Sequence, residues 1–466
     1  MGTIPKSNIM QEKIFKAYDI RGIYPTEIDA DVVYKIGRAT VKELNAKKIA
    51  IGRDARESGS ELLESLIKGV TDEGCDVINL DLITTPMLYF TSHHLNVDGA
   101  MAVTASHNPA EYNGIKICRK NAVPVGERSG MLIIKNLVIK NEFVESKEKG
   151  KVEKHDIKPA YYKYFSKFAN FGNKKFKIVI DCANTMGVLE LPLYEQFSEN
   201  FEITKLYCDL DNAYNAHEAN PLNTETLKEL QKKVISEKAD LGIAYDGDAD
   251  RVGFIDENGK IIPMDLVTGM IAKVILENNS GATILYDLRS SQAVKEVIEE
   301  NGGIAHECQV GHSFIKKQMV DEKALFAGEL SGHYYFQANK NGEVSTLAVF
   351  TLLNLMAETG RKISELVSNL QRYFHSGEIN LEVKDKDTAL KRLKEKYSNG
   401  LSADKTGELS ELDGIKISFW NNKKNSRWWF NVRASNTEPV LRLNLEADNE
   451  NLMREKQNEL LEIIRK

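Results

Sequence analysis

Residues 48–52 read KIAIG, and residues 99–104 read GAMAVT. Each run is short, almost wholly apolar and bounded by polar residues, which is typical of a strand buried on both faces. Between them, a segment that opens at Ser60 carries apolar residues at helical spacing, and Gly74 ends it. Residues 75–83 then predict a further strand. This order of strand, helix and strand predicts a largely parallel sheet covered by helices.

The same unit recurs along the chain, so we predict an α/β protein built from three similar mixed α/β domains. Further strands are predicted at residues 176–181, 240–245, 283–287 and 324–328. The last segment differs, because its strands lie on either side of polar turns and a single helix closes the chain. It therefore predicts a separate α+β domain, with strands at 415–420, 428–433 and 441–445 and a helix at 451–465.

Charged or polar stretches mark the expected domain boundaries, near residues 145–154, 256–260 and 376. A chain of 466 residues is long enough for three or four domains of ordinary size. We predict four domains, which span residues 1–153, 154–260, 261–371 and 372–466.

Composition narrows the class of protein. The net charge of -6 argues against a nucleic acid as partner. No apolar run approaches the length of a membrane span, and the first 15 residues lack the apolar core of a signal peptide. The five cysteines form no CxxC pair, which fits reduced thiols. We therefore expect a cytoplasmic protein that acts on a small molecule and needs neither a membrane nor a nucleic acid.

Residues 246–251 read Asp-Gly-Asp-Ala-Asp-Arg and follow a predicted strand. In a tight loop the three carboxylates of Asp246, Asp248 and Asp250 converge, and they repel one another unless a cation lies between them. Oxygen ligands select a hard ion, so magnesium or calcium is implied. A calcium loop of the EF-hand kind is the alternative, but it fails at Arg251, where glycine is needed, and because strands flank the segment.

Ser106 follows the strand at 99–104, and Pro109 closes the turn. The hydroxyl therefore lies at the carboxyl end of a parallel sheet, where ligands bind in such folds. No GxSxG elbow surrounds it, so a hydrolase nucleophile is less natural, and the turn alone also fits a simple capping turn. We expect His107 to point away from Ser106, and Lys116 to turn back toward it.

Two polar loops offer further contacts. Residues 328–333 read Gly-Glu-Leu-Ser-Gly-His. In an extended loop Glu329, Ser331 and His333 would face one side, a set suited to sugar hydroxyls, and an edge strand with a polar face is the alternative. Residues 433–439 read Arg-Ala-Ser-Asn-Thr-Glu-Pro. One guanidinium, two hydroxyls, one amide and turn N–H groups form a phosphate cradle, although an ordinary turn fits as well.

More arginines lie in turns or at strand ends. Arg21 follows Tyr18 in a short turn, and Arg289 follows the strand at 283–287. Each could be a plain surface ion pair. For Arg53 and Asp54, which follow the KIAIG strand, a surface ion pair is the interpretation we favour.

These four motifs, in this order and in separate segments, resemble those of the α-D-phosphohexomutase superfamily, most closely its phosphomannomutase/phosphoglucomutase group. The resemblance covers essentially the whole chain. It implies three similar mixed α/β domains and a smaller C-terminal domain around a central active-site cleft, with one loop from each domain. Two positions depart from the family pattern: Ala249 stands where many members have glycine, and Arg289 stands where many have lysine.

The resemblance also implies a role for each residue. The catalytic residues would be the phosphorylated Ser106, the acid–base candidates Lys116 and His333, and Arg251 beside the phosphoserine. The magnesium ligands would be Asp246, Asp248, Asp250 and an oxygen of the Ser106 phosphate. The sugar hydroxyls would be held by Glu329 and Ser331, and the non-reacting phosphate by Arg433, Ser435, Asn436 and Thr437. Further substrate contacts would be Tyr18, Arg21, Arg289 and His312.

The activity implied is that of a magnesium-dependent isomerase, which interconverts hexose 1-phosphate and hexose 6-phosphate of mannose or glucose. It would act through a phosphoserine enzyme, with hexose 1,6-bisphosphate as intermediate and activator, in a monomer or a dimer. Phosphoglucosamine mutase is an alternative, although relatives of that type tend to carry a polar residue where Leu330 stands. A phosphatase that uses the same serine and a non-catalytic metal- or sugar-phosphate-binding protein are the others.

Overall fold

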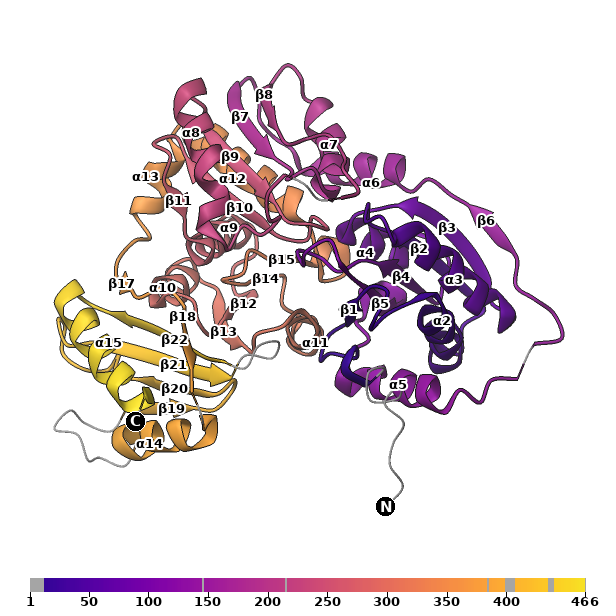
Figure 1. Ribbon diagram of the computed structural model, residues 1–466. Coiled ribbons are helices and arrows are strands. Elements are labelled where there is room, and N and C mark those ends of the chain that lie inside the picture. The colour runs from indigo at the N-terminus through magenta and orange to yellow at the C-terminus, as the bar shows by residue number, and fades with distance from the viewer. Residues whose placement is uncertain are drawn as a thin grey trace.

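The computed structural model of the protein describes residues 12–144, 146–213, 216–383, 385–398, 407–434 and 440–465. Within these residues the strands form four sheets, which follow one another along the chain. Figure 1 shows the first unit at one side of the molecule, the C-terminal unit at the opposite side, and the other two between them. This arrangement confirms the predicted class of three α/β units followed by an α+β unit.

The sheet of the first unit has the strand order β1-β5-β4-β2-β3-β6. β2 pairs in parallel with β3 and β4, as the KIAIG and GAMAVT runs predict. β5, however, runs antiparallel to β4, because only a short turn joins the two strands. The prediction of a largely parallel sheet is therefore wrong at this edge. The elements are β1 (Ile20–Ile23), α2 (Ala30–Leu44), β2 (Lys48–Arg53), α3 (Gly59–Asp72), β3 (Asp76–Leu82), α4 (Thr85–His94), β4 (Gly99–Val103), β5 (Tyr112–Arg119), α5 (Met131–Lys140) and β6 (Val152–Lys154).

The second unit has the strand order β11-β10-β9-β7-β8. β7 is parallel to β8 and β9, and the hairpin of β9 and β10 forms the antiparallel edge. The strands predicted at 176–181 and 240–245 are β7 and β9. The elements are α6 (Lys158–Phe165), β7 (Phe176–Asp181), α7 (Leu191–Glu195), β8 (Phe201–Leu206), α8 (Lys228–Glu237), β9 (Leu241–Tyr245), β10 (Val252–Asp256) and β11 (Ile261–Ile262).

The third unit repeats the design, with the strand order β13-β12-β14-β15-β16. β12 is parallel to β13 and β14, and β14 forms a hairpin with β15. The elements are α9 (Met264–Glu277), β12 (Thr283–Asp287), α10 (Gln292–Glu300), β13 (Ile304–Cys308), α11 (His312–Glu322), β14 (Phe326–Gly328), β15 (Tyr334–Phe336), β16 (Gly342–Glu343), α12 (Ser345–Thr359) and α13 (Ile363–Ser368).

One device is common to the three α/β units and positions the motifs. In each unit a strand of the parallel part turns directly into an antiparallel partner, namely β4 into β5, β9 into β10, and β14 into β15. The loop of each hairpin carries one of the polar motifs, at residues 104–109, 246–251 and 329–333. The motifs therefore occupy equivalent places in the three units, at the carboxyl end of a parallel strand.

The C-terminal unit is an antiparallel sheet of order β17-β22-β21-β20-β19, and β18 also pairs with β22. The strands predicted at 415–420, 428–433 and 441–445 are present, as is the closing helix. Apolar side chains of β20, β21 and β22 form a core of their own with α14 and α15. The elements are β17 (Phe374–His375), β18 (Ile379–Glu382), α14 (Lys386–Ser398), β19 (Glu408–Ser410), β20 (Ile415–Ser418), β21 (Trp428–Ala434), β22 (Val440–Ala447) and α15 (Glu450–Arg465).

The three α/β units share one core and, inside it, one buried carboxyl group. Phe90, Tyr194 and Phe350 come from the three units and belong to a single cluster of buried apolar residues. The carboxylate of Glu190 accepts hydrogen bonds from Thr84 Oγ1 of the first unit at 2.9 Å and from Thr346 Oγ1 of the third at 2.8 Å. This contact ties the three units together at one point.

Stability is expected to depend on pH through Glu190. Burial raises the pKa of its carboxyl from 4.5 to about 7. The folded chain therefore holds a proton that the unfolded chain releases between these values, so stability falls as pH rises through that window. Glu190→Gln should flatten this dependence in thermal unfolding between about pH 5 and about pH 8. Glu195→Gln, which removes an exposed carboxylate paired with Lys205, is the control, and equal slopes in both variants would contradict the assignment.

Candidate active site

The acidic loop between β9 and β10 brings three buried carboxylates together. One oxygen of each of Asp246, Asp248 and Asp250 lies within 4.8 Å of the others. Burial, followed by repulsion from Asp250 and Asp248, raises the pKa of Asp246 well above its usual value. A set of carboxylates under this strain is relieved by a cation. The geometry therefore suits a hard metal ion held by oxygen atoms.

Cationic side chains from two other loops meet these carboxylates. Lys116 Nζ on β5 lies 2.7 Å from Asp248 Oδ2 and 2.5 Å from Asp250 Oδ2. His333 Nε2 lies 3.2 Å from Asp250 Oδ1, and Arg251 Nε donates to the same ring nitrogen of His333 at 3.2 Å. Asp248 Oδ1 is buried and has no hydrogen-bond partner among the described residues. An acceptor of this kind fits a metal ligand, since a buried oxygen that is left unpaired destabilises the fold.

Ser106 lies against the acidic loop. Its hydroxyl donates to Asp246 Oδ2 at 3.3 Å, and its side chain is almost fully buried. The residue has a positive φ of 53°, a left-handed conformation that is uncommon for serine and frequent at functional sites. The contact joins a hydroxyl of the first unit to a carboxylate of the second.

His107 lies beside this hydroxyl, with Nδ1 3.3 Å from Ser106 Oγ. The prediction that His107 points away is wrong. The reason is the left-handed turn at Ser106, which brings two consecutive side chains to the same side. Burial, followed by the charge of Arg251, holds the pKa of His107 well below its usual value. The ring is therefore neutral at physiological pH.

The two loops approach each other so closely that one position requires glycine. A Cβ atom on Gly247 would lie 2.2 Å from the carbonyl oxygen of Ser106. Thr85, at the start of α4, strengthens the contact, since its N–H donates to Asp248 O at 3.0 Å and its Oγ1 to Asp248 Oδ2 at 2.6 Å. The acidic loop is thus held against the serine loop by backbone and side-chain bonds.

Arg56, which was not among the predicted site residues, organises the serine loop. Its guanidinium is fully buried and donates to four carbonyl oxygens. These belong to Ser106 at 2.8 Å, Asn108 at 2.7 Å, Pro109 at 2.6 Å and Tyr112 at 3.0 Å. Its Nε donates to Asp54 at 3.1 Å, so Asp54 is part of a buried pair rather than the surface pair predicted with Arg53.

Arg56→Ala is expected to lower turnover by about 10²-fold or more, because a displacement of about 1 Å at a reacting group has that effect. The Michaelis constant for substrate should change much less, because Arg56 contacts only the loop and Asp54. Arg56→Lys, which keeps the charge but only some of the donors, should recover part of the rate. Steady-state kinetics at saturating metal measures the split. Equal loss in turnover and affinity, or no rescue by lysine, would contradict this positioning role.

The loop between β14 and β15 gathers the predicted sugar-binding residues. Ser331 Oγ donates to Glu329 Oε2 at 3.1 Å and lies 2.9 Å from His333 Nδ1. The three side chains meet because the loop is a tight turn, with Gly332 at a positive φ of 85°, and not because it is extended as predicted. Tyr335 also donates to Glu329, which fixes the orientation of that carboxylate.

Residues predicted to contact substrate also lie at the junctions between units. The Arg21 guanidinium donates to Asn108 Oδ1 of the serine loop at 2.5 Å. The hydroxyl of Tyr18 donates to Val310 O at 3.1 Å, and its ring lies 5.6 Å from that of His312 at the start of α11. Tyr18 and Arg21 therefore join the first unit's N-terminal segment to the serine loop and the third unit.

The predicted phosphate cradle is described only in part. Arg433, at the end of β21, is buried, and its terminal nitrogen lies 3.7 Å from Glu378. Arg289 of the third unit lies on the other side of Glu378, with 3.0 Å between NH1 and Oε2. The remaining members of the predicted cradle, Ser435, Asn436 and Thr437, lie outside the described residues.

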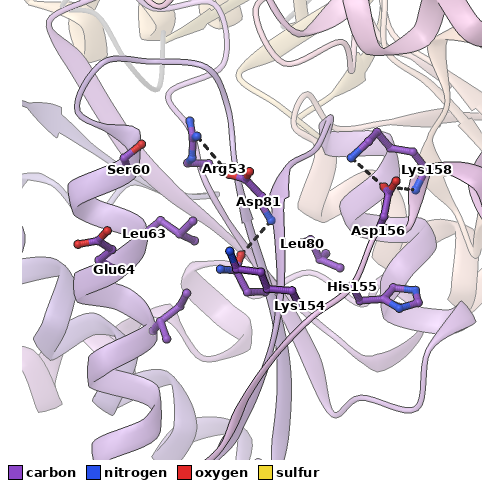
Figure 2. A pocket seen from close by; sticks show the side chains of 12 residues that line it. Arg53, Ser60, Leu63, Glu64, Leu80, Asp81, Lys154, His155, Asp156 and Lys158 are labelled. Carbon is purple, nitrogen blue, oxygen red and sulfur yellow. Dashed lines mark hydrogen bonds and ion pairs between the residues drawn. The ribbon is translucent and has the colours of Figure 1, made fainter.

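A pocket of about 450 Å³ lies apart from these groups, between α3 and the carboxyl ends of β2, β3 and β6. Figure 2 shows Arg53 in its wall, directed at Asp81, and Lys158 directed at Asp156. Arg53 pairs with Asp81 at 3.1 Å, so the prediction that it pairs with Asp54 is wrong. None of the predicted site residues lines this pocket.

Comparison with known proteins covers nearly the whole chain. Family models described as phosphoglucomutase/phosphomannomutase match four segments. They are alpha/beta/alpha domain I at residues 12–145, domain II at 159–259, domain III at 263–373 and the C-terminal domain at 378–463. No helix in the described part of the chain is long and apolar enough to cross a bilayer.

Curated relatives and a solved structure agree with the family models. A phosphomannomutase of Methanocaldococcus jannaschii is 42% identical over 460 residues, which cover 97% of this chain and 98% of that one. A phosphomannomutase/phosphoglucomutase of Pseudomonas aeruginosa is 34% identical, with 96% and 94% covered. The crystal structure of a phosphoglucomutase/phosphomannomutase family protein from Burkholderia thailandensis has a TM-score of 0.86 at 28% identity, with 97% of each chain covered.

Proposed function

Because the chain belongs to the phosphoglucomutase/phosphomannomutase family, we propose that it interconverts hexose 1-phosphate and hexose 6-phosphate by relaying a phosphoryl group through Ser106. The observation that carries the proposal is the contact between Ser106 Oγ and Asp246 Oδ2 at 3.3 Å. It sets a hydroxyl from one unit against a metal-type carboxylate cluster from another. A phosphate on that oxygen would complete the ligand set of the cluster.

The proposed reaction has two transfers. Phosphoserine 106 gives its phosphoryl group to O6 of a hexose 1-phosphate, which yields the hexose 1,6-bisphosphate and a free serine hydroxyl. After the bisphosphate turns over, its 1-phosphoryl group returns to Ser106 and hexose 6-phosphate leaves. Phosphoryl transfer depends mainly on positioning and charge stabilisation, so the residues around Ser106 carry most of the effect.

We propose Mg²⁺ as the cation held by Asp246, Asp248 and Asp250. It would neutralise charge on the phosphoryl oxygens when bound. Lys116 and His333 both contact these carboxylates, and we propose that they exchange protons with the sugar hydroxyl that reacts. Arg251 contacts His333 and lies 3.9 Å from Asp246, where its charge faces the transferred group.

The other side chains of the site would recognise substrate. Glu329 and Ser331 present a carboxylate and a hydroxyl suited to the sugar's 3- and 4-hydroxyls. Arg433 would hold the phosphate that does not react, together with Ser435, Asn436 and Thr437. Tyr18, Arg21, Arg289 and His312 would add contacts from the first and third units. The cradle reads phosphate, which fits a substrate that binds in two orientations.

Turnover on mannose, glucose and N-acetylglucosamine 1-phosphates, measured in parallel with free phosphate, tests the proposal. We expect conversion of mannose and glucose 1-phosphates to the 6-phosphates at comparable rates, with N-acetylglucosamine 1-phosphate slower and little free phosphate. Faster conversion of the N-acetylglucosamine ester would favour the glucosamine alternative. Release of phosphate without isomerisation would instead identify a phosphatase, and binding without turnover a non-catalytic protein.

Several expectations about the protein as a whole stay predictions within this proposal. They are a cytoplasmic location, a monomeric or dimeric state, activation by hexose 1,6-bisphosphate, and domain boundaries after residues 153, 260 and 371. Size-exclusion chromatography with light scattering measures the oligomeric state directly. A trimer or larger assembly would contradict the prediction.

A further inference from the structure

A single carboxylate, that of Glu378, lies among three arginines at the junction of the third and fourth units. Arg289 NH1 lies 3.0 Å from Glu378 Oε2, and Arg442 NH1 lies 3.0 Å from Oε1. Arg433 NH2 lies 3.7 Å from Oε2, and the amide of Asn444 donates to the same oxygen at 3.4 Å. Glu378 precedes β18, in the segment that links the two units.

The charges around Glu378 are unequally compensated. Arg289 has a second carboxylate of its own, because its Nε donates to Asp287 at 2.9 Å. Arg433 makes only the longer contact with Glu378, and its buried Nε has no hydrogen-bond partner among the described residues. The other carboxyl group near Arg433 is that of Asp413. Arg433 is therefore the arginine with the weakest anionic contact in the cluster.

The protonation tendencies agree with this geometry. Burial alone would raise the pKa of Glu378, but Arg289, Arg433 and Arg442 hold it below its usual value. Burial, followed by repulsion from Arg289, lowers the pKa of Arg433. A buried arginine whose charge is disfavoured gains from an anion that brings more negative charge and more acceptor oxygens than one carboxylate does.

We infer that Glu378 is a displaceable counter-anion, which occupies the arginine cluster of the phosphate cradle until the substrate's non-reacting phosphate replaces it. This inference rests on the proposed function and names a residue that sets substrate affinity. A phosphate dianion offers three acceptor oxygens and about twice the charge of the carboxylate. The Glu378 side chain is 22% exposed, whereas that of Arg433 is 3% exposed, so the carboxylate has a route to solvent and the guanidinium does not.

The consequence is opposite to that of an ordinary supporting ion pair. If Glu378 only held the arginines in place, its removal would weaken phosphate binding. If it competes with phosphate, its removal leaves Arg433 and Arg289 facing each other without it, and phosphate binding becomes tighter. Like charges at a site typically cost several kcal/mol, of which solvent exposure leaves a part, so we expect an effect of about ten-fold.

The test is calorimetric binding of glucose 6-phosphate to Glu378→Gln on a Ser106→Ala background, in which no phosphoryl group is transferred. We expect the dissociation constant to fall about ten-fold relative to the Ser106→Ala parent. Glu378→Asp, which keeps the charge, should stay near the parent. Glu300→Gln is the matched control, since Glu300 pairs with Arg372 at 2.6 Å on α10 and does not contact Arg433.

Each outcome separates the inference from the function. Tighter binding in Glu378→Gln alone supports the counter-anion role. Unchanged or weaker binding in a folded Glu378→Gln variant overturns the role and leaves the mutase proposal standing. Failure of the Ser106→Ala parent to bind glucose 6-phosphate at all would overturn both. Circular dichroism and thermal unfolding establish that each variant is folded.

Discussion

Ser106→Ala is expected to abolish the phosphoryl relay while the protein stays folded. Turnover of hexose 1-phosphate should fall by roughly 10⁴-fold or more, the scale seen when a covalent nucleophile is removed. The hydroxyl makes contacts of only 3.3 Å with Asp246 and His107, so its loss removes little packing or hydrogen bonding. The thermal unfolding temperature should therefore change by no more than a few degrees.

Ser60→Ala is the matched control for this substitution, because Ser60 is an exposed serine on α3 of the same unit. It should retain the rate of the unmodified protein. Turnover in Ser106→Ala within ten-fold of normal would sink the relay, whatever its effect on stability. A loss of folding in that variant alone would mean that the left-handed turn at Ser106 depends on the hydroxyl.

Asp248→Asn should have the second largest effect, since it removes one charge from the acidic cluster. Asp248 accepts from Lys116 Nζ and from Thr85 Oγ1, so asparagine loses part of a fixed network as well as a metal ligand. We expect the affinity for Mg²⁺ to fall by about ten-fold or more, because a neutral amide replaces a carboxylate at a hard cation. Calorimetric titration with Mg²⁺ alone measures this without turnover.

Asp31→Asn serves as control for the metal assignment, because Asp31 is an exposed carboxylate whose ion pair is with Lys35. Its affinity for Mg²⁺ and its turnover should match those of the unmodified protein. If Asp248→Asn binds Mg²⁺ as tightly as the unmodified protein, then the acidic cluster is not the metal site. A metal requirement that moves in both variants would point to a general charge effect instead.

The sequence predicts the parallel strands well, because buried apolar runs such as KIAIG and GAMAVT leave few alternatives. It does not predict β5, whose residues 112–119 mix polar and apolar side chains without a clear period. That strand decides where Lys116 lies, since antiparallel pairing sets Lys116 opposite Ala102 and within reach of Asp248. Tertiary pairing, rather than local pattern, positions this side chain.

The site residues divide in the same way. The spacing of the acidic triplet suffices to suggest convergence, because alternate residues of a tight loop can face one point. The position of His107 depends on a left-handed backbone at Ser106, which no local pattern marks. Arg56 is buried against four carbonyl groups, whereas arginine is usually exposed, so composition argues against finding it there. Only the folded loop supplies that cluster of acceptors.

Mass spectrometry of Ser106 tests the central claim most directly. The purified protein should carry one added phosphate that maps to Ser106, and an excess of hexose 1-phosphate should move that phosphate onto the sugar. Addition of hexose 1,6-bisphosphate to the dephosphorylated protein should restore it. A protein that turns over hexose phosphates with Ser106 unmodified throughout, or with the phosphate on another residue, would contradict the account.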